Sequence, residues 1–246
     1  MRAIILAAGR GSRMGQATEN SHKCLTILNG KSLLQWQLKA IKESNVDNIT
    51  VVTGYRNDLL NGEFKKIINE RWAETNMVAS LFCNEDYEGD TIISYSDIVY
   101  KSDHIANLIN CKGEISILAD LNWKSLWELR FENPLDDAET FKSIDGKLLE
   151  IGGKTNSIND IQAQYMGLIK VTKEGWRKMK KHYDNLSNIQ RDKLDMTSLL
   201  AGLLKDRVDI NASFINGGWC EVDNFTDVVF YEKMLTENTN WSHKWF

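Results

Sequence analysis

The feature that most constrains this chain is a short apolar run that leads directly into a loop of small residues, LAAGRGSRMG at residues 6–15. Residues 2–6 predict a buried strand, and the glycines let consecutive N–H groups converge on an anion. Arg13 adds a planar donor suited to phosphate oxygens, and Lys23 follows as a compact positive charge. A strand entering such a loop predicts an α/β fold with an anion-binding site at the strand's carboxyl end.

Two common phosphate-binding loops fit this string less well. A dinucleotide-binding turn needs its third glycine earlier than Gly15, and it needs an acidic residue after the second strand, where residues 53–55 read Thr-Gly-Tyr. A Walker A loop needs GxxxxGK followed by serine or threonine, and this string is absent. A plain turn with surface arginines, or an α/β module that only binds, leaves the cationic loop unexplained.

Alternating patterns in the first half predict a parallel, doubly wound sheet covered on both faces. We expect strands at 2–6, 48–53, 79–83, 91–95 and 114–118, and helices at 32–44, 59–69 and 102–110.

The second half has a more antiparallel pattern. Asp145-Gly146 is a hairpin turn signal among short segments. We expect short hairpin-like segments at 129–132, 139–143 and 147–151, strands at 163–171, 208–214 and 219–222, and helices at 174–182, 196–204 and from 225 onward.

Composition excludes several classes of protein. The chain has 246 residues, of which 42% are hydrophobic and 26% charged, as in soluble globular domains. Its net charge of −4 argues against a general nucleic-acid binder. No apolar stretch approaches the roughly 18 residues of a membrane helix, so no membrane insertion is expected. The four scattered cysteines lack CxxC spacing, which favours reduced thiols and a cytoplasmic location. The pattern leaves the oligomeric state open.

Two acidic residues follow predicted strands. Asp97 and Asp223 should lie at the same ligand-bearing edge of the sheet. One or two carboxylates plus phosphate oxygens are what Mg²⁺ prefers, so this pair predicts a magnesium site. Each aspartate alone could instead cap a turn or helix. We rank Glu221 lower as an accessory ligand, because strand alternation is expected to point it away.

The loop and several other segments resemble nucleotidyltransferases that couple nucleoside triphosphates to phosphorylated sugars or small alcohols. That family's signature is LAAGxGxRM followed by a proline–lysine pair, and here His22 stands in place of the proline before Lys23. The resemblance extends over most of the chain and includes segments 48–55, 75–81, 95–100 and 219–224. Within the family, the chain is most similar to cytidylyltransferases that act on phosphocholine or 2-aminoethylphosphonate.

The resemblance implies a Rossmann-like fold with a mixed, mostly parallel central sheet, helices on both faces and a small antiparallel acceptor-binding part. We expect one domain, 1–246, in which residues 1–120 mainly bind nucleotide and residues 121–246 mainly bind the acceptor. The implied reaction is Mg²⁺-dependent transfer of CMP from CTP to phosphocholine, 2-aminoethylphosphonate or a related aminophosphate such as phosphoglutamine, with release of pyrophosphate. Decoration of a surface polysaccharide or lipid, such as a capsule, is the implied role.

Residue roles follow from the match. Lys23 is expected to stabilise charge on the α-phosphate, Arg13 to hold the β- and γ-phosphates, and Asp97 with Asp223 to bind Mg²⁺. The expected nucleotide-binding residues are Leu6, Ala7, Ala8, Gly9, Gly11, Ser12, Arg13, Lys23, Asn76, Ser80 and Asp97.

Aromatic and acidic residues in the middle of the chain suit a cationic acceptor. The acceptor-binding candidates are Asp137, Glu139, Lys154, Tyr165 and Trp219. Lys154 is included because relatives that act on sugar phosphates grip the acceptor phosphate with a lysine at a similar place. Arg130 could bind a carboxylate of an amino-acid-derived acceptor.

Two alternatives stay open: a sugar-phosphate nucleotidyltransferase that uses UTP or dTTP, and a non-catalytic regulator on the same fold. A regulator would be expected to have lost Lys23, Arg13 or an aspartate.

Overall fold

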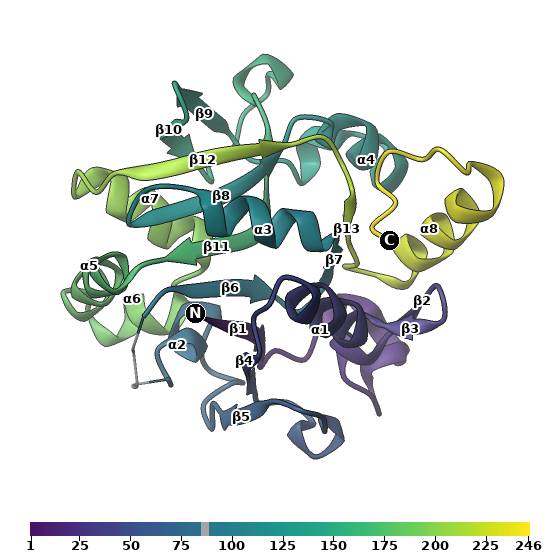
Figure 1. Cartoon of the computed structure of the whole chain (residues 1–246), viewed down its shortest axis with the longest axis horizontal. Helices are drawn as coiled ribbons and strands as arrows, with labels where there is room; N and C mark the ends of the chain where they lie inside the picture. Colours follow the sequence, from purple (N-terminus) through teal and green to yellow (C-terminus); the bar gives the residue numbers. More distant parts are fainter. Residues whose placement is uncertain (85–88) are drawn as a thin grey trace.

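A mixed β-sheet organises the molecule in a computed structural model that describes residues 1–84 and 89–246. Within these residues, nine strands pair in the order β5-β4-β1-β6-β11-β8-β12-β10-β9 (Figure 1). Their bounds are β1 Arg2–Ala7, β4 Asn48–Thr53, β5 Lys65–Ile68, β6 Thr91–Tyr95, β8 Ile115–Asp120, β9 Phe141–Ile144, β10 Lys147–Ile151, β11 Gln164–Val171 and β12 Ile210–Ile215. Two small ribbons pair β2 (Ile27–Leu28) with β3 (Lys31–Ser32), and β7 (Ile98–Tyr100) with β13 (Trp219–Glu221).

Helices cover both faces of this sheet. Their bounds are α1 Leu33–Glu43, α2 Met77–Leu81, α3 Ser102–Asn110, α4 Trp123–Arg130, α5 Lys173–Asp184, α6 Asn188–Lys193, α7 Met196–Lys205 and α8 Phe225–Glu237. Short 3₁₀ turns at Ser12–Thr18 and Lys23–Leu25 follow β1.

Strand β1 shows why its sequence is apolar from Ala3 to Ala7. Successive side chains point to opposite faces, and both faces are covered. Ala3, Ile5 and Ala7 therefore pack in the core with α1, and Ile4 and Leu6 pack in the core with α2 and α7. All six residues of the strand are buried.

Strand direction places the loops. β1 pairs in parallel with β4 and with β6, with Leu6 opposite Val52 on one side and Tyr95 on the other. β11 runs antiparallel between β6 and β8, and β9 and β10 form an antiparallel hairpin at the far edge. The expected fold class, a mixed and mostly parallel sheet with helices on both faces, is confirmed.

The structure also contains the predicted hairpin turn. Asp145 and Gly146 both have positive φ values, 48° and 72°, as the tight turn between β9 and β10 requires.

Three expected elements are wrong. The helix at 59–69 is replaced by a 3₁₀ turn, Asn57–Leu59, and by β5, because pairing with β4 outweighs a helical pattern already weakened by Gly62. The strand at 79–83 is helix α2, since a short apolar run fits either element. The hairpin segment at 129–132 begins inside helix α4.

Residues 241–246 fold back against the body. The buried His243 places Nε2 3.0 Å from Oδ2 of Asp120, the last residue of β8. The same Oδ2 atom accepts a hydrogen bond of 2.9 Å from the Trp219 indole. This segment therefore supports β13, the strand that carries Glu221.

Candidate active site

Two adjacent cavities open at the carboxyl edge of the sheet. The loop cavity, about 260 Å³, is lined by the glycine-rich loop, by Lys23 and by residues around α2. The aromatic cavity, about 280 Å³, is lined mainly by residues of the second half of the chain. Arg13 lines both cavities, so its guanidinium lies where ligands in the two spaces would meet.

The glycine-rich loop is shaped by the close approach of Lys23. Gly11 has φ +68°, and a Cβ placed on it would lie 2.8 Å from the Lys23 Cβ atom. Only glycine suits that position for both reasons. The tight turn continues as the Met14 N–H donates to the Gly11 carbonyl at 3.0 Å.

Lys23 is a buried ammonium held between two carboxylates. Its side chain is 8% exposed, and Nζ lies 2.7 Å from Asp97 Oδ2 and 3.0 Å from Asp223 Oδ1. Burial alone would lower the pKa of Lys23, but the charges of Asp97 and Asp223 raise that pKa to about 12. The ammonium is therefore charged at neutral pH.

His22 replaces the proline of the family signature with two hydrogen bonds. Its Nε2 lies 2.8 Å from the Ala7 carbonyl oxygen, and its Nδ1 accepts the Cys24 N–H at 3.2 Å. Burial lowers the pKa of His22, which favours the neutral ring that can donate from one nitrogen and accept at the other. The histidine thus fixes the backbone at both ends of the loop.

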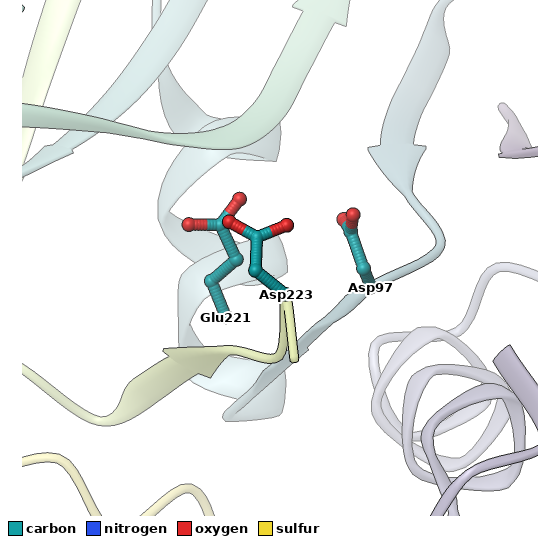
Figure 2. A group of neighbouring side chains, drawn as sticks. All are labelled: Asp97, Glu221 and Asp223. Carbon is teal, nitrogen blue, oxygen red and sulfur yellow. The ribbon is translucent and has the colours of Figure 1, made fainter. Parts of the chain in front are cut away.

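Three carboxylates converge beside Lys23. Each of Asp97, Glu221 and Asp223 offers an oxygen, and these oxygens lie within 4.8 Å of one another. Figure 2 shows Asp97 on the turn between β6 and β7. It faces Glu221 and Asp223, which lie at and just after the end of β13. The Val222 N–H donates to the Asp97 carbonyl at 2.8 Å, which ties the two segments together.

The expectation that Glu221 points away is wrong. Residues i and i+2 of an extended segment lie on the same side, so Glu221 and Asp223 face the same space. Burial, and then the neighbouring Asp223 charge, raise the pKa of Glu221. Burial opposes ionisation of Asp223 as well, but Lys23 and Arg13 lower the pKa of that carboxyl.

The donor set fits a divalent cation. All three groups are carboxylates, the hard oxygen ligands that Mg²⁺ takes. Among the described side chains, the buried Oδ1 atom of Asp97 makes no hydrogen bond, which leaves a charged oxygen for an additional partner. Asp97 and Asp223, with Glu221, could therefore hold such an ion.

Arg130 lies behind this cluster. Its position does not agree with the expectation that it binds a carboxylate of the acceptor. Its side chain is fully buried, and its nitrogens lie 3.0 Å from Glu221, 3.1 Å from Asp223 and 3.2 Å from Asp227. The guanidinium also packs over the Trp127 ring. With three carboxylates as partners, Arg130 leaves no exposed nitrogen for an acceptor carboxylate.

The predicted nucleotide-binding residues are brought together. All of them except Ala7 line the loop cavity, and Ala7 contributes its carbonyl to His22 instead. Sequence reasoning missed Trp72, Thr75, Met77 and Ser96, which line the same cavity. Thr75, Met77 and Ser96 lie in segments that resemble the family, but their residue types alone do not indicate a nucleotide contact, and Trp72 lies outside those segments.

The predicted acceptor-binding residues divide into two groups. Asp137, Glu139, Tyr165 and Trp219 line the aromatic cavity. Lys154 is exposed and donates to the Asp137 carbonyl at 3.1 Å. It is not among the described residues that line this cavity.

Further residues of the aromatic cavity were missed. They include Tyr95, Asp195 and Thr197. Asp195 caps α7 by accepting the Ser198 N–H at 2.7 Å, a pattern visible in the sequence only once the helix start is known.

A lysine and an arginine that share the Asp223 carboxylate between two cavities suit an enzyme that joins two anionic substrates. On this mixed α/β sheet, that arrangement defines a nucleotidyltransferase.

Comparison with known proteins identifies the family. Residues 3–119 match the MobA-like NTP transferase domain. The CTP:phosphoglutamine cytidylyltransferase of Campylobacter jejuni is 38% identical over 247 residues, which span 93% of this chain and 98% of that protein. The choline-phosphate cytidylyltransferase of Haemophilus influenzae is 36% identical over 104 residues, 40% of this chain and 45% of that protein. The chain therefore belongs to the nucleotidyltransferase superfamily, and it is similar to cytidylyltransferases within it.

A solved structure shares the fold. The inositol-1-phosphate CTP transferase of T. maritima superposes with a TM-score of 0.75 at 16% identity, covering 96% of each chain. Among the described residues, no helix combines the length and apolar character needed to cross a bilayer.

Proposed function

We propose that this enzyme is a Mg²⁺-dependent cytidylyltransferase that transfers CMP from CTP to a small phosphorylated or phosphonate acceptor. One observation carries the proposal: Lys23 and Arg13 both contact Asp223 at the junction of the loop cavity and the aromatic cavity. The similarity to a relative named CTP:phosphoglutamine cytidylyltransferase supports the choice of nucleotide.

In the proposed reaction, a phosphate or phosphonate oxygen of the acceptor attacks the α-phosphorus of CTP in line. A new P–O bond forms, the bond between the α-phosphorus and the bridging oxygen breaks, and pyrophosphate leaves with that electron pair. The attacking oxygen is already anionic, so no general base is needed. Catalysis comes from positioning and charge neutralisation.

The residues divide this work. The loop backbone around Gly9 and Gly11 cradles the triphosphate. Lys23 stabilises charge that grows on the α-phosphate, and the exposed Arg13 holds the leaving phosphates. The bound ion would supply further charge neutralisation between nucleotide and acceptor. Asp97, Asp223 and Glu221 would hold it.

The acceptor occupies the aromatic cavity in this proposal. Its walls combine rings such as Tyr165 with the carboxylates of Asp137, Glu139 and Asp195. That chemistry suits an acceptor with an anionic end beside Arg13 and a cationic end among the acids. Phosphoglutamine, phosphocholine and 2-aminoethylphosphonate each have this character.

A crossed screen tests the proposal. CTP, UTP, dTTP, ATP and GTP are combined with these acceptors, with phosphoethanolamine and with hexose 1-phosphates, and pyrophosphate release is followed with and without Mg²⁺. We expect turnover with CTP and an aminophosphate or phosphonate only when Mg²⁺ is present. Turnover only with UTP or dTTP and a sugar phosphate would contradict the proposal. Nucleotide binding without turnover on any acceptor would favour a regulator.

The metal site has its own test. Asp223→Asn should weaken Mn²⁺ binding, followed by electron paramagnetic resonance, at least tenfold. Asp209→Asn is the matched control, because the Asp209 side chain is 86% exposed and pairs only with Lys147 in the described structure. Equal Mn²⁺ affinity in both variants would show that the ion does not bind at this site.

A further inference from the structure

The Asp223 carboxylate is held by three cations of the protein itself. Its Oδ1 atom lies 3.0 Å from Lys23 Nζ and 2.9 Å from Arg13 Nη2. Its Oδ2 atom lies 3.1 Å from Arg13 Nη1 and 3.1 Å from Arg130 Nη2. An ionised carboxylate has about four lone-pair positions. These four contacts therefore occupy the positions on Asp223 through which a divalent ion would bind.

The three cations differ in how firmly they are held. The Lys23 side chain is 8% exposed and also pairs with Asp97. The Arg130 side chain is fully buried and has two further carboxylate partners. The Arg13 side chain is 68% exposed, and Asp223 is the carboxylate with which it pairs in the described part of the chain. Arg13 is therefore the cation that can leave Asp223 most easily, because water already reaches its side chain and would hydrate the released guanidinium.

Arg13 also has a second binding partner within reach in the proposed complex. Its side chain lines the loop cavity, together with Gly9 and Gly11 of the loop that would cradle the phosphates. A planar guanidinium binds phosphate oxygens as it binds a carboxylate, through two parallel N–H groups. A triphosphate in the loop cavity would therefore offer Arg13 the same kind of two-bond contact that it makes with Asp223.

We propose that Arg13 is the resident counter-ion of Asp223 in the free enzyme, and that a bound triphosphate draws Arg13 onto its phosphate oxygens and so opens Asp223 to the divalent ion. This inference rests on the proposed function, because it takes the loop cavity as the triphosphate site and the three carboxylates as the metal site. The acidic cluster then binds a divalent ion poorly until the nucleotide arrives.

Arg13→Met is the decisive variant. It removes the guanidinium and keeps an unbranched side chain at an exposed position. Mn²⁺ binding is followed by electron paramagnetic resonance without nucleotide, and CTP binding is followed by calorimetry in EDTA. We expect the variant to bind Mn²⁺ at least threefold more tightly than wild type and to bind CTP at least threefold more weakly. A merely structural role for Arg13 would weaken both.

Arg10→Met is the matched control. Arg10 belongs to the same loop and is also exposed, but its guanidinium lies over the Tyr55 ring, 5.7 Å from the ring centroid. The control removes the same charge without freeing Asp223, so its Mn²⁺ affinity should equal that of wild type. An equal gain in Arg13→Met and Arg10→Met would show that only the net charge of the loop affects the ion, and would overturn the proposal.

The outcomes separate this inference from the proposed function. Arg13→Gln, which is uncharged but polar, makes the same test if Arg13→Met does not fold. Mn²⁺ binding that is unchanged or weaker in these variants, or CTP binding that is unchanged, overturns the exchange of Arg13 even if cytidylyl transfer is observed. Opposite changes in the two affinities, without turnover on any acceptor, support the exchange and contradict the transferase.

Discussion

The Lys23 ammonium lies 2.7 Å from Oδ2 of Asp97, although 74 residues separate them in the sequence. The same ammonium reaches Asp223 across 200 residues. The parallel strands β1 and β6 lead toward Lys23 and Asp97, and the antiparallel pairing of β13 with β7 brings Asp223 to them. The charges of the proposed triphosphate site are therefore arranged before any ligand binds.

Lys23→Ala should leave a folded protein with much lower activity. Removing one donor to a developing charge costs about 2–4 kcal/mol of transition-state stabilisation, or roughly 30- to 1,000-fold in kcat/KM. Steady-state kinetics with circular dichroism as a check on folding would measure this. Lys39→Ala, on the surface of α1, is the control and should retain activity. Wild-type turnover in folded Lys23→Ala would show that Lys23 does not contribute to catalysis.

Gly11→Ala should affect both stability and activity. The new Cβ would lie 2.8 Å from the Lys23 Cβ, on a backbone with φ +68°, so either the loop or the lysine must move. We expect a loss of about 1–3 kcal/mol in the free energy of unfolding and a large fall in kcat/KM.

Gly30→Ala is the matched control for that change. Gly30 has a similar φ of +75°, but a Cβ there would meet no described atom within 4 Å. The control should lose about 1 kcal/mol of stability and keep its activity. Equal kcat/KM in the two variants would contradict the importance of the contact between Gly11 and Lys23.

Arg130→Met should destabilise the fold strongly. It would leave the carboxylates of Glu221, Asp223 and Asp227 without their shared cation, and breaking a buried ion pair from one side costs about 3–5 kcal/mol. Chemical denaturation would measure the change. Arg177→Met, where the exposed guanidinium pairs with Glu174 on the same helix, should change stability by less than about 0.5 kcal/mol. Similar small effects for both would show that Arg130 does not hold the carboxylates in place.

His104 should make the stability of the protein sensitive to acid. Burial, and then the Lys101 charge, lower the pKa of His104 from 6.5 to about 4. The folded state favours the neutral ring, so the stability it contributes is complete above pH 6.5 and is lost as the pH falls toward 4. The loss over this window is roughly 3 kcal/mol.

His104→Gln removes this titration, because glutamine is neutral throughout. Between pH 7 and pH 4.5, the wild type should lose at least about 2 kcal/mol more unfolding free energy than the variant loses. A constant difference across that range would show that His104 titrates normally in the folded state.

Much of the fold could be predicted because local patterns and sheet geometry agree. The run at 48–53 forms β4 with those bounds. Asp97 and Asp223 do meet at Lys23, but the antiparallel ribbon of β7 and β13 brings them together, not two strands of one sheet as expected. The glycine-rich loop carried enough information to place Lys23 beside them.

The remaining features depend on tertiary contacts that no local pattern reports. Arg130 looks like an ordinary residue near a helix end, and only the folded chain brings three carboxylates to it. β5 is a strand only because β4 offers it an edge.

The link between Asp120, Trp219 and His243 has a consequence for biosynthesis. On the ribosome, the glycine-rich loop and Lys23 emerge well before β13 and the segment that supports it. A nascent chain that has not yet released His243 from the exit tunnel can form the cradle for phosphate but lacks the support of its acidic wall. Catalytic competence should therefore arise only after His243 has left the exit tunnel, and a polypeptide stalled before that point would bind nucleotide without consuming it.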